Sequence, residues 1–180
     1  MILIGLGANI SGTWGAPEAT LGRVHELFEQ NRVVTKAFSP LFVSEPLGPS
    51  QPAYTNATAL VETASPALSL LLKLKQIEAK AGRRVRERRF GKRWGARPLD
   101  LDLLTYHDIV INWDRHNGKA IPRQGRQLIL PHPELHKRPF VLEPLSQIAP
   151  SWRHPIFRLT AKEMLRALKP QHRGRIICEL

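Results

Sequence analysis

Two aspartates stand two residues apart in the stretch RWGARPLDLDLL, residues 93–104. Because the side chains of an extended strand alternate between its faces, Asp100 and Asp102 share one face and the leucines around them share the other. Two carboxylates on one face can hold a hard cation such as Mg²⁺, which prefers oxygen ligands. The same pattern also fits a half-buried strand whose polar face is solvated. The spacing alone leaves both interpretations open.

A strongly basic segment precedes this strand. Residues 83–97 hold eight Lys or Arg against one Glu, and the whole chain has a formal net charge of +12. Such a charge indicates an anionic partner, which could be nucleic acid, a membrane surface or a nucleotide. The two glycines and the weak periodicity of the segment predict a mobile loop.

The composition is that of an ordinary globular protein. The 180 residues are 42% hydrophobic and 23% charged, which excludes disordered and fibrous classes and suits a single domain over 1–180. The single cysteine, Cys178, cannot form an internal disulfide, which suits a reducing compartment. The start of the chain lacks the pattern of a signal peptide, and no run approaches the roughly 18 apolar residues of a membrane span. We therefore expect a cytoplasmic protein.

Hydrophobic periodicity and end signals predict the elements that position these residues. Helices are predicted to begin at Pro17, at Pro66 with Ser65 as the cap, near residue 140, and at Thr160 with a capping box to Glu163. Strands are predicted at 1–7, 33–37, 39–44, 55–63, around the two aspartates, at 108–112 and at 175–180. The order strand, helix, two strands, helix, strand is typical of a split βαβ unit. We therefore predict an α+β fold, a ferredoxin-like antiparallel sheet with helices packed on it in three αβα layers.

Three motifs follow one another in a specific order. They are SEPLGPSQPAYTNA at 44–57, RWGARPLDLDLL at 93–104 and LPHPELHKRPFVLEPL at 130–145. In this order they resemble the 6-hydroxymethyl-7,8-dihydropterin pyrophosphokinase family of folate biosynthesis, from Gly5 to about Pro150. The resemblance implies an ATP-dependent diphosphotransferase that moves pyrophosphate from ATP to the pterin hydroxymethyl group and releases AMP. It also implies two Mg²⁺ ions on Asp100 and Asp102, which neutralise the triphosphate.

The resemblance places ATP against the basic part of the chain. It implies phosphate contacts from Arg97 and Arg138, because a guanidinium matches phosphate oxygens and stays charged. It implies a nucleotide contact from His132 through a ring N–H. The remaining implied ATP or catalytic residues are Glu78, whose alternative role is a surface charge at a helix end, Trp94, Arg83, and one of Arg84 or Arg86 in a loop that closes over ATP.

The resemblance also assigns the pterin pocket. It implies that Tyr54 and Phe140 sandwich the flat ring, that Asn56 reads the ring edge through both donor and acceptor, and that Ser44 and Leu47 line the pocket.

Some positions depart from the family pattern. Lys75 stands where a glutamine is expected, and Pro133 follows His132 where an aromatic residue can occur in the family. Gln127 and Ile129 stand at positions where some members use different, polar residues around ATP. The segments 83–94 and 113–125 are also longer than in the pattern. These departures concern nucleotide contacts more than the metal or the pterin.

Two alternatives stay open. One is a divergent pyrophosphokinase that acts on another pteridine, and the other is a basic nucleic-acid-binding module. Paired aspartates on a strand face have no use in the latter. The resemblance implies ATP and the pterin as partners and transfer of the product to dihydropteroate synthase. We expect no nucleic-acid or membrane partner, and a monomer.

Overall fold

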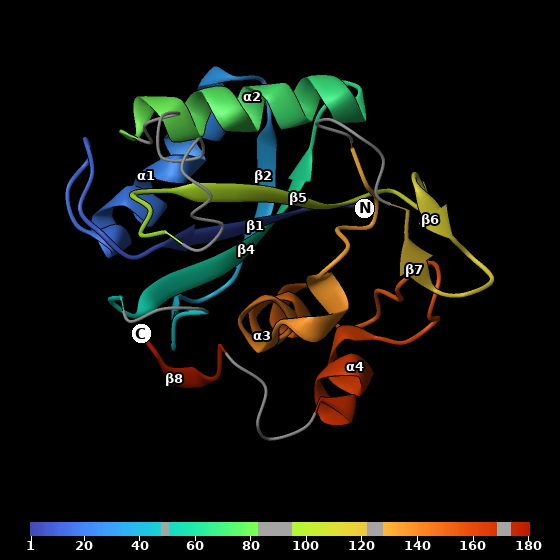
Figure 1. Ribbon diagram of the computed structural model, residues 1–180. Helices are drawn as coiled ribbons and strands as arrows, with labels where there is room; N and C mark the ends of the chain where they lie inside the picture. Colours follow the sequence, from blue (N-terminus) through green and yellow to red (C-terminus); the bar gives the residue numbers. More distant parts are fainter. Residues whose placement is uncertain (48–50, 83–94, 122–127, 169–173) are drawn as a thin grey trace.

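A six-stranded antiparallel sheet forms the centre of the computed structural model, which describes residues 1–47, 51–82, 95–121, 128–168 and 174–180 (Figure 1). Its strands run in the order β5-β1-β4-β3-β8, with β2 also paired to β4. The strands are β1 (Ile2–Ala8), β2 (Val34–Phe38), β3 (Phe42–Ser44), β4 (Tyr54–Glu62), β5 (Asp100–Tyr106) and β8 (Ile176–Glu179). A separate hairpin is formed by β6 (Trp113–Asp114) and β7 (Lys119–Ala120).

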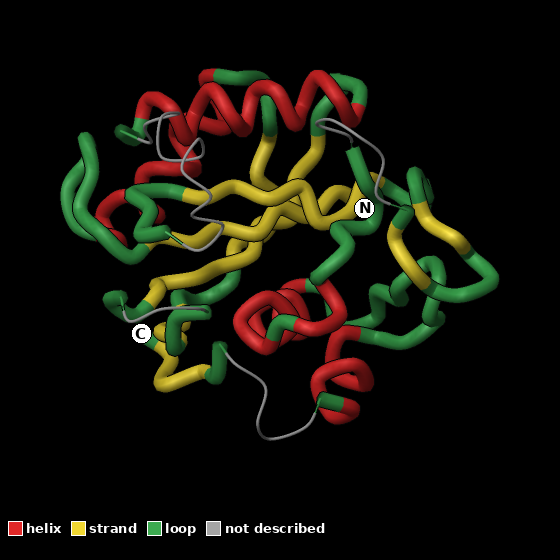
Figure 2. Tube along the Cα trace, viewed as in Figure 1, coloured by secondary structure: helices red, strands yellow, loops and turns green. Residues whose placement is uncertain are grey.

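Helices cover both faces of the sheet (Figure 2). On one face, α1 (Pro17–Gln30) and α2 (Ala67–Lys80) enclose the larger hydrophobic core with the sheet. On the other face, α3 (Pro139–Ile148) packs on the sheet and α4 (Ala161–Ala167) packs on α3, around a second core. A short 3₁₀ turn, Leu135–Lys137, leads into α3. This arrangement confirms the predicted α+β fold with a ferredoxin-like sheet between helices.

The central strand β1 has bulky side chains on one face and few on the other. Ile2, Ile4 and Leu6 enter the core beneath α1 and α2, whereas Gly5 and Gly7 face the side of α3. In the sheet, Gly7 pairs with Asn56 of β4 on one side and with Asp100 of β5 on the other. The side chain of Leu104 packs against Gly5, whereas the absence of a side chain at Gly7 leaves space above the sheet.

Strand β5 lies at the edge of the sheet, beside β1. Leu101 and Leu103 are buried in the core beneath α1 and α2, while Asp100 and Asp102 are partly exposed. The predicted division of β5 into an apolar face and an acidic face is therefore confirmed.

The predicted strand at 108–112 is wrong. Only Ile111 forms a β-bridge, with Leu130. His107 and Asn112 adopt positive φ angles of 52° and 55°, which turn the backbone out of the extended conformation at both ends of the segment. The segment that follows begins with the hairpin β6–β7, in which Trp113 is buried and its indole N–H donates to the carbonyl of Pro131 at 2.8 Å.

The structure tests the predicted N-terminal caps of two helices, α2 and α4. Ser65 is not the cap of α2, since Pro66 occupies that position and the Ser65 hydroxyl instead accepts a hydrogen bond from Lys73 Nζ at 2.9 Å. The capping box of Thr160 and Glu163 at the start of α4 is confirmed. None of the helices in the described part of the chain is long and apolar enough to cross a bilayer.

Candidate active site

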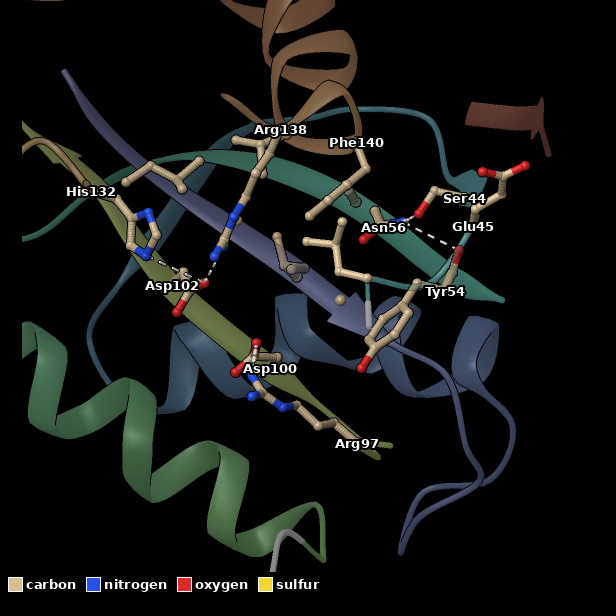
Figure 3. Close-up of a pocket in the computed structure, with 17 residues that line it drawn as sticks. Ser44, Glu45, Tyr54, Asn56, Arg97, Asp100, Asp102, His132, Arg138 and Phe140 are labelled. Carbon is tan, nitrogen blue, oxygen red and sulfur yellow. Dashed lines mark hydrogen bonds and ion pairs between the residues drawn. The ribbon is translucent and has the colours of Figure 1, made fainter. Parts of the chain in front are cut away.

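A pocket of about 260 Å³ lies on the face of the sheet that carries α3, where Gly7 of β1 leaves space (Figure 3). The walls come from β3, β4, β5, the start of α3 and the segment that precedes β5. The sequence-predicted residues that line it are Ser44, Leu47, Tyr54, Asn56, Arg97, Asp100, Asp102, His132, Arg138 and Phe140. The structure therefore brings both predicted halves of the site, acidic and aromatic, into one cavity.

Cationic and polar groups surround the two aspartates. The Asp102 Oδ2 atom lies 3.7 Å from Arg138 Nη1 and 3.9 Å from His132 Nε2. Lys75 Nζ lies 3.9 Å from the other oxygen of Asp102, and Arg97 forms an ion pair with Asp100. The acidic face of β5 is thus enclosed by positive charge from three separate parts of the chain.

The aspartates suit a hard cation that takes most of its ligands from a substrate. Their side chains are 19% and 31% exposed, so both carboxylates stay open to the pocket. Within the described residues, no group of three or more His, Cys, Asp or Glu side chains could hold a metal by itself. Mg²⁺ commonly uses one or two carboxylates with phosphate oxygens and water, so the two aspartates fit it as a substrate-bound ion.

His132 is held as a neutral hydrogen-bond donor. Burial lowers its pKa, with a smaller lowering from Arg138, against the opposing effect of Asp102. Its Nδ1 accepts the backbone N–H of Glu134 at 3.2 Å, which places the ring proton on Nε2. The Nε2–H donor therefore faces Asp102 and the pocket.

The opposite half of the pocket is built around Asn56. This side chain is 4% exposed, and its amide nitrogen donates to Ser44 Oγ at 2.9 Å and to the carbonyl of Tyr54 at 3.2 Å. A Cβ added at Gly7 would lie 3.4 Å from the Asn56 carbonyl oxygen. The orientation of Asn56 is therefore fixed by β3 and β4, and the glycine beside it leaves the space next to its side-chain oxygen unfilled.

Tyr54 and Phe140 enter the pocket from β4 and α3. The Tyr54 hydroxyl donates to the carbonyl of Gly95 at 3.0 Å, while the Arg138 guanidinium lies 5.9 Å from the centre of the Phe140 ring. Behind Phe140 lies Gly174, whose φ is +81° and whose added Cβ would approach the ring to 2.6 Å. The chain just before β8 therefore supports the aromatic wall, a contribution that the sequence did not indicate.

Asn9 is a second residue that the sequence analysis missed. It is 3% exposed, accepts the backbone N–H of Arg97 at 2.7 Å and donates to Gln51 Oε1 at 3.3 Å and the carbonyl of Pro52 at 3.2 Å. It therefore joins the end of β1 to two loops beside the pocket. The only sequence signal is an asparagine directly after a buried strand. Asn9 does not itself line the pocket. The lining residues that were not predicted are Gly5, Leu6, Gly7, Glu45, Ala57, Leu104 and Val141.

Glu78 is placed differently from the other predicted residues. Its side chain is 3% exposed, so it is not a surface charge at a helix end, and it lies behind β5 rather than in the pocket lining. Arg83, Arg84, Arg86 and Trp94, the predicted loop at 83–94, and Gln127 lie outside the described residues.

The chain resembles known proteins over most of its length. A family model described as 7,8-dihydro-6-hydroxymethylpterin-pyrophosphokinase (HPPK) matches residues 3–150. The 2-amino-4-hydroxy-6-hydroxymethyldihydropteridine pyrophosphokinase of Haemophilus influenzae is 39% identical over 147 residues, which cover 81% of this chain and 79% of that protein. The protein of the same name from Pseudomonas aeruginosa is 36% identical over 155 residues, covering 86% of this chain and 83% of the relative.

The fold also matches a solved structure. The wild-type HPPK-DHPS of Plasmodium falciparum aligns with a TM-score of 0.62 at 15% identity, covering 92% of this chain and 43% of that one. This chain therefore spans less than half the length of that protein, and the likeness supports the fold. Together with the family match over residues 3–150, these findings show that the chain belongs to the HPPK family of pyrophosphokinases.

Proposed function

We propose that this protein transfers pyrophosphate from ATP to the hydroxymethyl group of 6-hydroxymethyl-7,8-dihydropterin, giving AMP and the pterin diphosphate in folate biosynthesis. One observation carries the proposal: a single pocket is lined by paired aspartates among cations in one half and by a buried amide and two aromatic side chains in the other. The first half suits a triphosphate with its metal, and the second suits a flat polar heterocycle.

The acidic half would hold the nucleotide with two Mg²⁺ ions on Asp100 and Asp102. Bound Mg²⁺ would neutralise the triphosphate and polarise the phosphoryl group that is transferred. Arg97 and Arg138 would then exchange their aspartate partners for phosphate oxygens. Such donors assist the reaction because their positions are fixed before charge develops.

His132 would assist the nucleotide as a donor rather than as a base. Its Nδ1 is already engaged by a backbone N–H, so only Nε2–H can face a phosphate oxygen. We assign Arg83, Arg86 and Trp94 to ATP binding on the sequence motifs alone. We assign Glu78 to support of β5, whose Leu101 N–H it accepts.

The aromatic half would bind the pterin. Tyr54 and Phe140 supply ring faces for stacking, and Asn56 has a carbonyl oxygen beside the pocket while its nitrogen is held by Ser44. Leu47 adds an apolar wall. The transfer needs little covalent help from the protein, so holding the hydroxymethyl oxygen in line with the β-phosphorus is the main task of this half.

The test is formation of AMP from ATP, Mg²⁺ and 6-hydroxymethyl-7,8-dihydropterin by the purified protein. We expect AMP and the pterin diphosphate in equal amounts, and none of either when the pterin or Mg²⁺ is omitted. AMP formed only with a different pteridine would reject the proposed substrate but keep the reaction type. If the product is then converted by added dihydropteroate synthase, its proposed place before that enzyme is supported.

A further inference from the structure

The free edge of β5 is bound by side chains of α2. Strand β5 ends the described sheet and pairs with β1 on one side only. Leu101 lies between the two aspartates, and its backbone N–H donates to Glu78 Oε1 at 2.8 Å. Its carbonyl accepts a hydrogen bond from Lys75 Nζ, also at 2.8 Å. Both backbone polar groups of this residue are therefore satisfied by one turn of a helix instead of a neighbouring strand.

Lys75 and Glu78 also bind each other, with 2.5 Å between Nζ and Oε1. We call these contacts with Leu101 the Lys75–Glu78 bridge. The Glu78 side chain is 3% exposed, so its carboxylate depends on hydrogen bonds and opposite charge instead of water. Losing the N–H donor at position 75 would leave the buried Glu78 carboxylate with one hydrogen bond fewer in a poorly solvated place, which is costly. The bridge therefore resists displacement of either side chain.

The bridge reaches the pocket around the edge of the sheet. Helix α2 packs on the face opposite the pocket, yet the Lys75 ammonium group lies 3.9 Å from Asp102 Oδ1. An ammonium group has three N–H donors, and two are directed to Glu78 and to the Leu101 carbonyl. The third is available to the Asp102 carboxylate. Lys75 thus contacts the backbone between the aspartates and lies beside one of their side chains.

We propose that Lys75 is a positioning residue, which with Glu78 fixes the unpaired edge of β5 so that Asp100 and Asp102 present their carboxylates together. The proposal rests on the proposed function, in which these carboxylates hold the nucleotide-bound metal. It also explains a departure in the sequence, because a lysine donor here takes the place of the glutamine expected in the family.

The physical need for such a device follows from the position of β5. A strand at the edge of a sheet has unpaired N–H and C=O groups and opens more readily than a central strand. Catalytic groups must be held within about 0.5 Å of their working positions to be effective. The bridge supplies, at the residue between the two ligands, the hydrogen bonds that a further strand would otherwise provide.

The test compares Lys75→Met with a matched control on the same helix, Lys73→Met. Lys73 also binds a backbone carbonyl and a side chain, those of Asn31 at 2.8 Å and Ser65 at 2.9 Å, but it lies outside the pocket lining. In the ligand-free protein we expect the Leu101 amide of Lys75→Met to exchange at least about tenfold faster by NMR. In Lys73→Met its exchange should be unchanged.

Kinetics and rescue complete the test. We expect Lys75→Met to lower kcat by about tenfold or more while the KM for ATP changes less than about threefold, because poor positioning affects the transition state more than binding. Lys75→Gln keeps an N–H donor without the charge and should restore both Leu101 protection and kcat to within about threefold. Thermal denaturation, measured in parallel, separates these effects from a general loss of folding.

Three results would overturn the proposal. The first is wild-type Leu101 exchange and kcat in Lys75→Met, and the second is an equal loss of kcat in Lys73→Met. Lys75→Gln behaving like Lys75→Met would also reject it, because charge and not the hydrogen bonds would then be responsible. If instead the wild-type protein forms no AMP, the proposed function fails, while the exchange measurement still decides whether the bridge holds β5.

Discussion

At the scale of single residues, the site depends on carboxylates that already have partners before any ligand binds. Asp102 lies near Arg138, His132 and Lys75, and Asp100 pairs with Arg97. These contacts, at 3.7–3.9 Å for Asp102, are long for hydrogen bonds. Arg138 is therefore close enough to balance the charge of Asp102 but loose enough to turn toward phosphate, whereas Lys75 is held by Glu78 and the Leu101 carbonyl.

Replacing Asp102 by Ala should remove a metal ligand and leave the triphosphate charge uncompensated. We expect a loss of at least about a hundredfold in kcat/KM, as observed when preorganised charge stabilisation is removed. The fold should survive because the Asp102 side chain is partly exposed. Circular dichroism and AMP release measured on the same preparation check this, and near-normal turnover of the folded variant at saturating Mg²⁺ would contradict it.

Gly7→Ala should weaken pterin binding without harming the fold. The added Cβ would lie 3.4 Å from Asn56 Oδ1 and 3.7 Å from a Tyr54 ring carbon, which are ordinary contact distances. The methyl group therefore fits the sheet but occupies space at the pterin half of the pocket. We expect the KM for the pterin to rise about tenfold, with that for ATP nearly unchanged. An equal rise in both constants would argue against this division of the pocket.

At the scale of elements, two histidines are packed inside an aromatic group between the hairpin β6–β7 and the turn before α3. The ring centres of His136 and His154 lie 4.7 Å and 4.5 Å from that of Phe157, with Trp113 close by. Burial lowers the pKa of each histidine to about 4. Both rings are therefore neutral in the folded protein at neutral pH.

This burial predicts a loss of stability in acid. The ordinary histidine pKa of 6.5 exceeds the folded value of about 4, so the unfolded chain binds more protons between these pH values. The stabilisation is complete above pH 6.5 and is lost as the pH falls toward 4. His136→Phe keeps a ring in the aromatic group but removes one titrating site. Its Tm should fall less than that of the wild type between pH 7.5 and pH 4.5, and equal losses would contradict the prediction.

The elements also show where sequence reasoning succeeds. The alternation of β5, the start of α1 at Pro17 and the capping box of Thr160 were predictable because each depends on residues a few positions apart. The strand expected at 108–112 failed because the left-handed residues at its ends, His107 and Asn112, bind the carbonyls of Met1 and Leu128, which are distant in sequence. Asn9 and the Lys75–Glu78 bridge were missed because their partners, such as Arg97 and Leu101, are distant in sequence and become neighbours only in the folded sheet.

At the scale of the whole molecule, the net charge of +12 has two possible uses. Among the described cations, Arg97 and Arg138 line the pocket, and Lys75 lies beside Asp102 at the edge of the sheet, so part of this charge is gathered around the acidic strand. A nucleic-acid-binding surface would instead present its cations outward along a groove or helix. The arrangement therefore favours capture of a nucleotide.

If the charge serves nucleotide capture, duplex DNA should bind only weakly and with steep salt dependence. The KM for ATP should also rise with ionic strength, while kcat changes little, because screening acts on association more than on the bound complex. Fluorescence anisotropy with labelled DNA and steady-state kinetics over a salt series check both expectations. Nanomolar DNA affinity at physiological salt, with no AMP formed, would reverse the interpretation.

Gly7 pairs with Asn56 on one side and with Asp100 on the other, so the sheet fixes the distance between these two residues across the pocket. Two strand spacings, about 10 Å, separate the backbone of Asn56, the proposed pterin contact, from the backbone of Asp100, a proposed metal ligand. The hydrogen-bond register of the sheet fixes this backbone distance. Rotation of the side chains can change the distance between their ends only slightly. The protein should therefore select substrates by the length between ring and hydroxyl. A pterin with a hydroxyethyl arm should bind in the aromatic half yet be converted poorly. Efficient turnover of this analogue would show that the sheet does not fix the distance between the two halves of the pocket.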